Sequence, residues 1–74
     1  MKITVKLFAT FREQRFDIQE MSVPDGANIV KIITLLKIPL EEVAIIFVNG
    51  KHSSLNYILV NGDTLALFPP IGGG

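Results

Sequence analysis

The sequence predicts an α+β domain in which a mixed sheet of four to five strands packs on one main helix. Three patterns support this fold class: period-two alternation of apolar residues near both ends of the chain, a helical apolar stripe in the middle, and a continuous apolar run after that stripe. A chain of 74 residues has room for one such domain with one hydrophobic core.

The first half of the sheet is predicted to be a pair of strands. Residues 3–8 alternate between apolar and more polar side chains, as a strand with one buried face does. Residues 9–14 hold a charged pair and are expected to form a hairpin loop, after which residues 16–23 return as the second strand. Pro24-Asp25-Gly26 then ends that strand, because proline and glycine favour turns.

One helix is predicted after this pair. Asn28 is a good N-cap residue, and the apolar residues that follow are spaced three or four positions apart, so that they form one stripe on a helix. Pro39 disfavours helical geometry at the residue before it and ends the element. In a domain of this size the stripe must be buried against the sheet. Its members are Ile29, Ile32, Ile33 and Leu36.

The second half of the chain is predicted to supply the other strands. Residues 43–48 form a continuous apolar run rich in β-branched side chains, which is typical of a strand covered on both faces, so we expect it at the centre of the sheet. Asn49-Gly50 is a strong turn signal, and a weaker edge strand is expected within residues 51–57. A second turn at Asn61-Gly62-Asp63 leads into the last strand, residues 64–68. This order of elements is that of the β-grasp fold.

Composition narrows the classes of function. The chain carries seven basic and seven acidic side chains, so no net charge attracts nucleic acid or an anionic membrane, and we expect proteins as partners. It has no cysteine, which excludes disulfides, thiolate catalysis and cysteine metal sites. The N-terminus lacks the apolar core of a signal peptide and no stretch reaches membrane-spanning length, so a cytoplasmic location is expected.

The C-terminal end is the strongest functional signal. Pro69-Pro70 cannot donate hydrogen bonds to a sheet, so residues 1–68 are expected to form the domain and residues 69–74 a flexible tail that projects from it. Fully extended, this tail spans on the order of 20 Å, enough to enter the active site of a partner. A terminal glycine leaves its carboxylate open to attack. The predicted reactive group is therefore the carboxylate of Gly74, and Gly73 lets the tail thread a narrow channel.

Another protein must activate this carboxylate, because it is a poor electrophile until one oxygen becomes a good leaving group. The sequence contains neither a nucleotide-binding motif nor a cysteine nucleophile, so the chain is expected to be a substrate and not an enzyme. An inert terminus is the alternative, and Gly72-Gly73-Gly74 alone would not exclude it. The Pro-Pro spacer and the β-grasp order favour a functional tail.

A docking surface is predicted at the base of the tail. Phe8 and Phe68 are opposite in parity to the residues of their strands that should face the helix, so both rings are expected on the other face. The first and last strands of a β-grasp sheet are neighbours, which would bring the two rings together as an exposed apolar patch. The alternative is that a loop or a strand irregularity buries one ring.

Other polar residues have simpler interpretations. His52 is a single histidine without carboxylates at metal-ligand spacing, so no metal site is expected. Asp63 lies in a turn and is expected to stabilise it by local hydrogen bonds. Arg12 and Lys51 could meet an acidic partner, although scattered surface charges usually serve solubility.

Several motifs resemble those of the MoaD/ThiS family of ubiquitin-like sulfur carriers, over essentially the whole chain. Leu7-Phe8-Ala9 with Arg12-Glu13 is similar to the end of the family's first strand, and Val48-Asn49-Gly50 is similar to its central turn. The closing segment, from Asn61-Gly62-Asp63 through Phe68-Pro69-Pro70 to Gly73-Gly74, is the most specific. Phe-Pro-Pro before the glycines is similar to the MoaD branch, the small subunit of molybdopterin synthase.

The resemblance implies a sulfur-carrying cycle in which this chain does no catalysis. An E1-like adenylyltransferase of the MoeB/ThiF type would use ATP to adenylate Gly74, and a sulfur donor protein would convert the adenylate to a thiocarboxylate. A MoaE-type large subunit of molybdopterin synthase would then take the sulfur for the molybdenum or tungsten cofactor. The chain itself would bind no cofactor. The residues implied to bind partners are Phe8, Phe68, Pro69, Pro70, Ile71 and Gly72.

Other functions stay open at this point. A ThiS-like carrier for thiamin thiazole synthesis would use the same activation, and so would a ubiquitin-like modifier joined through Gly74 to lysines of target proteins. A plain interaction domain with an inert tail is a third possibility. Two departures from the family bear on the choice. His52 stands where an apolar contact residue is usual, which points to a different docking partner, and Gly72 completes a triple glycine that also occurs at ThiS-like ends.

Overall fold

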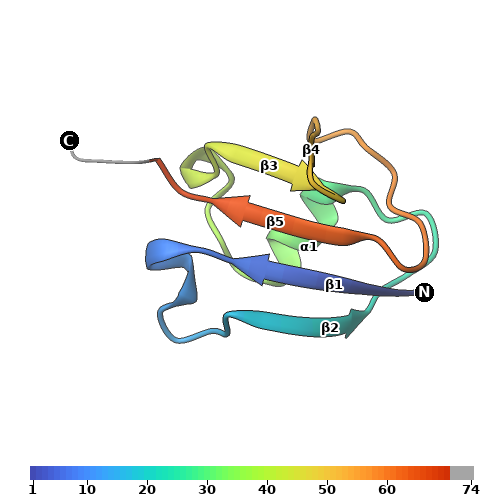
Figure 1. Ribbon diagram of the computed structural model, residues 1–74, viewed down its shortest axis with the longest axis horizontal. Coiled ribbons are helices and arrows are strands. Elements are labelled where there is room, and N and C mark those ends of the chain that lie inside the picture. Colours follow the sequence, from blue (N-terminus) through green and yellow to red (C-terminus); the bar gives the residue numbers. More distant parts are fainter. Residues whose placement is uncertain (71–74) are drawn as a thin grey trace.

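The computed structural model describes residues 1–70 of the chain. Their elements, in chain order, are β1 (Lys2–Leu7), the 3-10 helix η1 (Ala9–Arg12), β2 (Ile18–Ser22), α1 (Ile29–Leu35), the 3-10 helix η2 (Leu40–Glu42), β3 (Ile45–Val48), β4 (Lys51–His52) and β5 (Thr64–Phe68). The strands form one sheet in the order β2-β1-β5-β3-β4, with α1 on one face (Figure 1). β1 and β5 run parallel, and the other neighbours run antiparallel. The predicted α+β class and β-grasp order are confirmed, with five strands.

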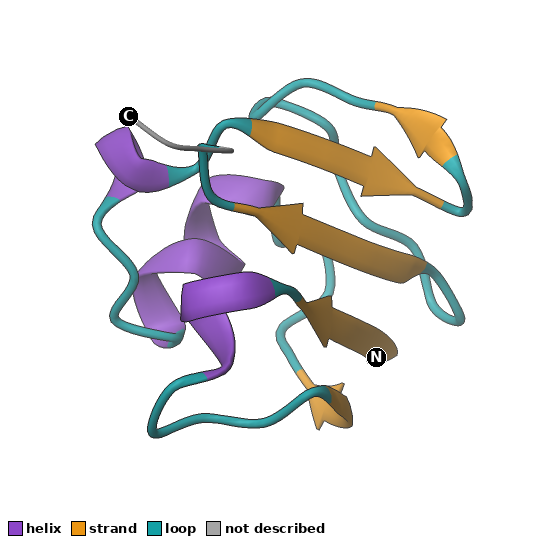
Figure 2. Cartoon of the chain, turned by 60° about the vertical axis from the view of Figure 1, so that its left-hand side comes forward, coloured by secondary structure: helices purple, strands orange, loops and turns teal. Residues whose placement is uncertain are grey.

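The hydrophobic core lies between the sheet and the helices, which gather on one side of the strands (Figure 2). In the parallel pair, Val5 lies opposite Leu65 and Leu7 lies opposite Leu67. All four side chains are fully buried, and burial of each contributes about 1.5–3 kcal/mol. The predicted helical stripe covers them, because its first three members are buried and the fourth is half-buried. Those members are Ile29, Ile32, Ile33 and Leu36.

Helix α1 begins where the sequence predicts and ends at Leu35, earlier than the end expected from Pro39. The side-chain oxygen of Asn28 accepts a hydrogen bond from the N–H of Lys31 at 2.9 Å, which confirms the N-cap. After the helix, Lys37 adopts a left-handed backbone with φ of 59°. The N–H of Ile38 then returns to the carbonyl of Ile33 at 3.2 Å and closes the helix end.

The centre of the sheet is β5, so the prediction that residues 43–48 form it was wrong. β3 lies between β5 and the two-residue strand β4. It begins only at Ile45, because the N–H of Val43 closes η2 on the carbonyl of Leu40 at 3.1 Å. The apolar run is longer than the strand because Val43 packs against the core from the preceding segment.

The loop predicted over residues 9–14 contains η1 and contributes to the core. Phe11 is 2% exposed, and its N–H donates to the carbonyl of Phe8 at 3.1 Å. Phe16, which was expected to begin the second strand, packs against the core from the loop, and β2 begins at Ile18. The connection is therefore a packed part of the domain.

Asp63 is a buried carboxylate that joins two turns. One oxygen accepts from the N–H of Val60 at 2.9 Å and from the hydroxyl of Tyr57 at 3.0 Å, and the other accepts from the side-chain amide of Asn49 at 2.8 Å. Asn49 in turn accepts from the N–H of Thr64 at 2.9 Å. The turn after β3 is thereby fixed to the start of β5, and the turn-stabilising role predicted for Asp63 is confirmed.

These contacts set the ionisation of the network. Burial alone would raise the pKa of Asp63, but hydrogen bonds from Val60, Asn49 and Tyr57 outweigh burial and hold that pKa below its ordinary value. The hydrogen bond that Tyr57 donates to Asp63, together with desolvation and the nearby negative charge, raises the pKa of Tyr57. The folded state therefore favours a charged Asp63 and a neutral Tyr57.

Replacing Asp63 by asparagine is expected to lower the free energy of unfolding by about 1–3 kcal/mol, because the new NH2 group cannot accept from the surrounding donors. Urea unfolding measures this loss, with an unchanged m value. The matched control is Asp25→Asn, since the Asp25 side chain is 91% exposed. The control is expected to change the free energy by less than about 0.5 kcal/mol. Equal losses in the two variants would contradict the role given to Asp63.

Acid is expected to remove the same stabilisation. A carboxylate with a lower pKa in the folded state binds fewer protons when folded, so its contribution is complete above the unfolded-state pKa of about 4 and is lost as the pH falls through the folded-state pKa. Urea unfolding between about pH 7 and pH 2 measures the effect. The free energies of the wild-type chain and Asp63→Asn should converge in acid, and a constant difference down to the lowest pH would count against this account.

Candidate functional site

The candidate site lies where β1 and β5 finish. The two strands are parallel, so their carboxyl ends lie at the same edge of the sheet (Figure 1). Phe8 directly follows β1, and Phe68 is the last residue of β5. Their rings stack with centroids 4.2 Å apart and planes 10° from parallel. The prediction that these two rings meet is confirmed, and their role in docking stays a prediction.

Two further rings extend this pair. Phe47 of β3 meets Phe68 edge-on, with centroids 5.7 Å apart and planes at 81°. The ring of His52 on β4 lies 4.4 Å from that of Phe47. The three phenylalanine side chains are half-buried and His52 is exposed, on the face of the sheet that α1 does not cover. We call Phe8, Phe47, Phe68 and His52 the aromatic cluster.

The sequence did not indicate that Phe47 belongs to the site, and it indicated His52 only through the resemblance, which puts a contact residue at that position. Phe47 and His52 lie opposite each other across the Asn49-Gly50 turn. That turn is the sequence signal from which their neighbourhood could have been predicted. Lys51 pairs with Val48, and its contact with an acidic partner stays a prediction. Residues that lie opposite each other on two strands point to the same face of the sheet, and Val48 is buried on the face that α1 covers. The side chain of Lys51 therefore lies on the face opposite the aromatic cluster.

Positive charge borders the aromatic cluster. The guanidinium carbon of Arg12 lies 5.3 Å from the centroid of the Phe8 ring, a contact that contributes about 0.5–1 kcal/mol at an exposed site. Arg12 is held there because its Nε donates to the carbonyl of Leu7 at 2.8 Å. Lys6 lines a shallow hollow of about 300 Å³ with Phe8 and Phe47. The surface is therefore apolar at its centre and cationic at its border.

The described chain leaves the sheet at the cluster. The carbonyl of Phe68 accepts from the N–H of Ala44 at 2.9 Å. Pro69 is buried and Pro70 is exposed, and neither proline has an N–H with which to extend the ladder. Contact of these prolines with a partner stays a prediction. The remaining predicted site residues, Ile71, Gly72, Gly73 and Gly74, lie outside the residues that the structure describes.

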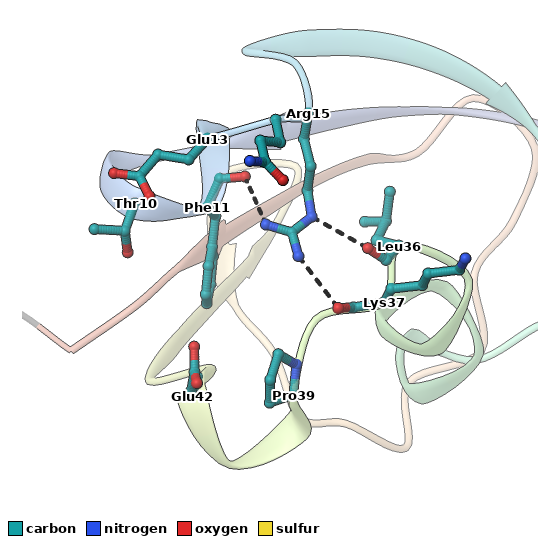
Figure 3. Close-up of a pocket in the computed structure, with 9 residues that line it drawn as sticks. Thr10, Phe11, Glu13, Arg15, Leu36, Lys37, Pro39 and Glu42 are labelled. Atoms are coloured by element: carbon teal, nitrogen blue, oxygen red, sulfur yellow. Dashed lines mark hydrogen bonds between the residues drawn. The ribbon is translucent and has the colours of Figure 1, made fainter.

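A larger hollow of about 570 Å³ lies between η1 and the ends of α1 and η2 (Figure 3). Arg15 lies across it and donates to three backbone carbonyls: Nε to Leu36 at 3.1 Å, Nη2 to Lys37 at 3.2 Å and Nη1 to Phe11 at 3.3 Å. No local sequence pattern indicated these contacts. Arg15 therefore bridges the loop after β1 to the end of the helix.

Residues 1–70 hold neither a candidate metal site nor a candidate membrane span. Over this range no three histidine, aspartate or glutamate side chains gather as a metal ion would require. No helix in the same range is both long and apolar enough to cross a membrane. His52, the one histidine of the chain, has the Phe47 ring as its neighbour.

Comparison with protein-family models matches residues 5–74 to the ThiS family. A comparison with curated protein sequences finds no match. The family match therefore covers nearly the whole chain and includes the C-terminal glycines.

Solved structures share the fold. A Pyrococcus furiosus protein assigned as molybdopterin converting factor subunit 1 is 31% identical, with a TM-score of 0.76 over 96% of this chain and 99% of that chain. SAMP1 from Haloferax volcanii is 24% identical, with a TM-score of 0.79 over the full length of both chains. A complex of subunits 1 and 2 of molybdopterin-converting factor from Helicobacter pylori contains a chain that is 22% identical, with a TM-score of 0.66 and full coverage of both chains. The chain belongs to the ThiS/MoaD family of ubiquitin-like sulfur carriers.

Proposed function

We propose that this chain carries sulfur for the synthesis of molybdopterin, the pterin of the molybdenum or tungsten cofactor. The observation that carries the proposal is the family match, because it runs through Gly74. The 31% identity to a molybdopterin converting factor subunit 1 supports this branch of the family. The chain acts as a protein substrate and as a non-catalytic small subunit, and the carboxylate of Gly74 is its reactive group.

Partner enzymes perform two displacement steps at Gly74. First, a carboxylate oxygen attacks the α-phosphorus of ATP and pyrophosphate leaves, which forms an acyl-adenylate. Second, a sulfide sulfur attacks the carboxyl carbon and AMP leaves, which forms the thiocarboxylate. An E1-like enzyme of the MoeB/ThiF type binds the ATP, and a sulfur donor protein supplies the sulfur. After the thiocarboxylate sulfur has displaced an oxygen leaving group from a carbon of the pterin precursor, water attacks the acyl carbon, cleaves the acyl–sulfur bond and restores the carboxylate.

The aromatic cluster supplies the surface on which these partners dock. Phe8 and Phe68 present half-buried rings directly before Pro69-Pro70, so a partner that covers the rings also receives the tail. Aromatic anchors of this kind dominate many protein interfaces. The complex of subunits 1 and 2 among the structural neighbours supports a large subunit of the MoaE type as one partner. Ile71 and Gly72 would then lie inside the partner with the terminal glycines.

A protein modifier conjugated through Gly74 is the second candidate. The observation that favours it is the likeness to a Haloferax volcanii protein described as small archaeal modifier protein 1. The activation step would be the same, and a lysine amine would attack the acyl-adenylate in place of sulfur. A carrier for thiamin thiazole synthesis, which the ThiS match also admits, would differ only in the final acceptor.

Incubation of the chain with ATP, sulfide and a cognate E1-like enzyme is expected to raise its intact mass by about 16 Da, because sulfur replaces one carboxylate oxygen. Mass spectrometry of the whole chain measures the gain, and omission of ATP is the control. A wild-type chain without the gain would contradict the carrier proposal. Deleting Gly74 shortens the reach of the tail by about 3.5 Å and is expected to abolish loading.

Deletion of Gly74 tests the reactive residue, and lysine remnants on cellular proteins separate the two candidate functions. Deletion of Gly74 is expected to leave the free energy of unfolding unchanged within about 0.5 kcal/mol, since the last residue contributes little to a fold. A folded deletion variant that still gained sulfur would rule out Gly74 as the reactive residue. Gly74 joined to lysines of cellular proteins, detected as isopeptide remnants, would favour the modifier.

Phe68→Ala is expected to weaken binding to the activating enzyme by about 1–3 kcal/mol, because it removes one ring of the stacked pair. Isothermal titration calorimetry measures the dissociation constant. Ile58→Ala is the control, since Ile58 is an apolar residue outside the cluster and is 54% exposed. The control is expected to leave the affinity unchanged, and an unchanged affinity in Phe68→Ala would remove the cluster from the docking surface.

A further inference from the structure

We call the connection between β1 and β2, residues 8–17, the η1 loop. We propose that Arg15 is a positioning residue for the tail: it clasps the η1 loop to the C-terminal end of α1 and so holds Arg12 over the Phe8 ring, at the base of the tail. Arg15 acts through other residues and belongs to the loop rather than to the aromatic cluster. This inference rests on the proposed function, because Arg15 is the residue that prepares the proposed docking surface.

The clasp is made of three hydrogen bonds to main-chain carbonyls. Nη1 of Arg15 donates to Phe11 within the η1 loop, while Nε and Nη2 donate to Leu36 and Lys37 at the end of α1 (Figure 3). The last carbonyls of a helix have no partner within the helix and carry partial negative charge, so a cation is stabilised there. The planar guanidinium can bond several carbonyls at once, which a lysine ammonium on a flexible stem cannot reproduce.

The η1 loop needs such a clasp. A hollow of about 570 Å³ separates it from the end of α1, and its Phe11 side chain is buried in the core. Ala9 and Gln14 have φ angles of 52° and 58°, in the left-handed region that non-glycine residues rarely adopt unless the surroundings hold them there. Arg15 directly follows Gln14, so its hydrogen bonds act where the backbone is strained.

Contacts continue from the loop to the tail. Arg12 donates to the carbonyl of Leu7 at 2.8 Å and lies 3.5 Å from a carboxylate oxygen of Asp17 on the returning side of the loop. The N–H of Leu7 donates to the carbonyl of Asp17 at 2.8 Å. Both sides of the loop must keep this arrangement for Arg12 to lie over Phe8, which in turn stacks on Phe68. Energetic coupling between separated groups travels through packed side chains and hydrogen bonds such as these.

Arg15→Lys tests the proposal, because it keeps the charge and loses the three-carbonyl clasp. In the loading reaction with the cognate E1-like enzyme, the KM for this chain is expected to rise roughly three- to tenfold while kcat stays unchanged, the pattern of a lost binding contribution. NMR of the free chain is expected to show altered proton shifts for the rings of Phe8 and Phe68. These shifts report the stacked pair without any partner.

Asn28→Ala is the matched control. It removes the cap at the other end of α1, so helix stability falls while the η1 loop keeps its contacts. The control is expected to lower the melting temperature and to leave the ring shifts and the KM unchanged. If both variants change the ring shifts and the KM alike, Arg15 has a merely structural role and the proposal is overturned. It is also overturned if Arg15→Lys changes neither.

A double variant tests the order of the contacts. Arg12→Gln is expected to raise the KM at least as much as Arg15→Lys, because Arg12 lies nearer the tail. If Arg15 acts through Arg12, combining the two substitutions raises the KM no further than Arg12→Gln alone. Independent, multiplying effects on the KM would overturn the proposal.

Failure of the sulfur-carrier function is distinguishable from failure of this inference. If the wild-type chain gains no mass from ATP and sulfide, the carrier proposal fails, and the ring shifts then decide about Arg15. Shifts that change in Arg15→Lys and not in Asn28→Ala support its positioning of the aromatic pair. Shifts that stay the same in Arg15→Lys overturn it.

Discussion

Because β1 and β5 pair in parallel in the middle of the sheet, their carboxyl ends finish at the same edge, and the whole site depends on that pairing. The register that buries Leu7 beside Leu67 places the next residue of each strand on the opposite face. Phe8 and Phe68 therefore stack where the chain leaves the sheet. An antiparallel pair would have set Phe8 at the far end of β5 from the tail. The backbone ladder thus builds the proposed docking surface and the exit point together.

The two ends of β5 serve different purposes. At its start, Asp63 and Asn49 are hydrogen-bonded to each other and accept hydrogen bonds from nearby backbone N–H groups. This buried network joins two turns. At its end, the aromatic cluster stays half-exposed and cations border it. Stability is therefore concentrated in the core and at the amino end of β5, while the docking surface that we propose lies at its carboxyl end. Substitutions in the cluster can alter binding without unfolding the domain, because the register is held elsewhere.

Local periodicity predicted most of this fold and half of the site. The stripe on α1, the cap at Asn28 and the outward parity of Phe8 and Phe68 follow from neighbours within a few residues. The central place of β5 did not follow, since the length of an apolar run does not say how many strands lie on each side of it. Phe11 was missed because a single core residue in a loop has no period. Two of the three hydrogen bonds of Arg15 join residues 21 and 22 positions apart, and no local pattern encodes them.

Affinity and reactivity must come from different parts of this chain. Fixing a glycine backbone costs more conformational entropy than fixing any other residue, so a glycine-rich tail is poorly suited to supply binding energy. The stacked rings are well suited, because their positions are set by the sheet before a partner arrives and a preorganised surface loses little freedom on binding. Stacking of the two rings adds only about 0.5–1.5 kcal/mol to the stability of the fold. The part of their apolar surface that stays exposed is available for an interface. In the proposed function, the cluster therefore provides the affinity that lets a weakly binding carboxylate reach a partner's active site.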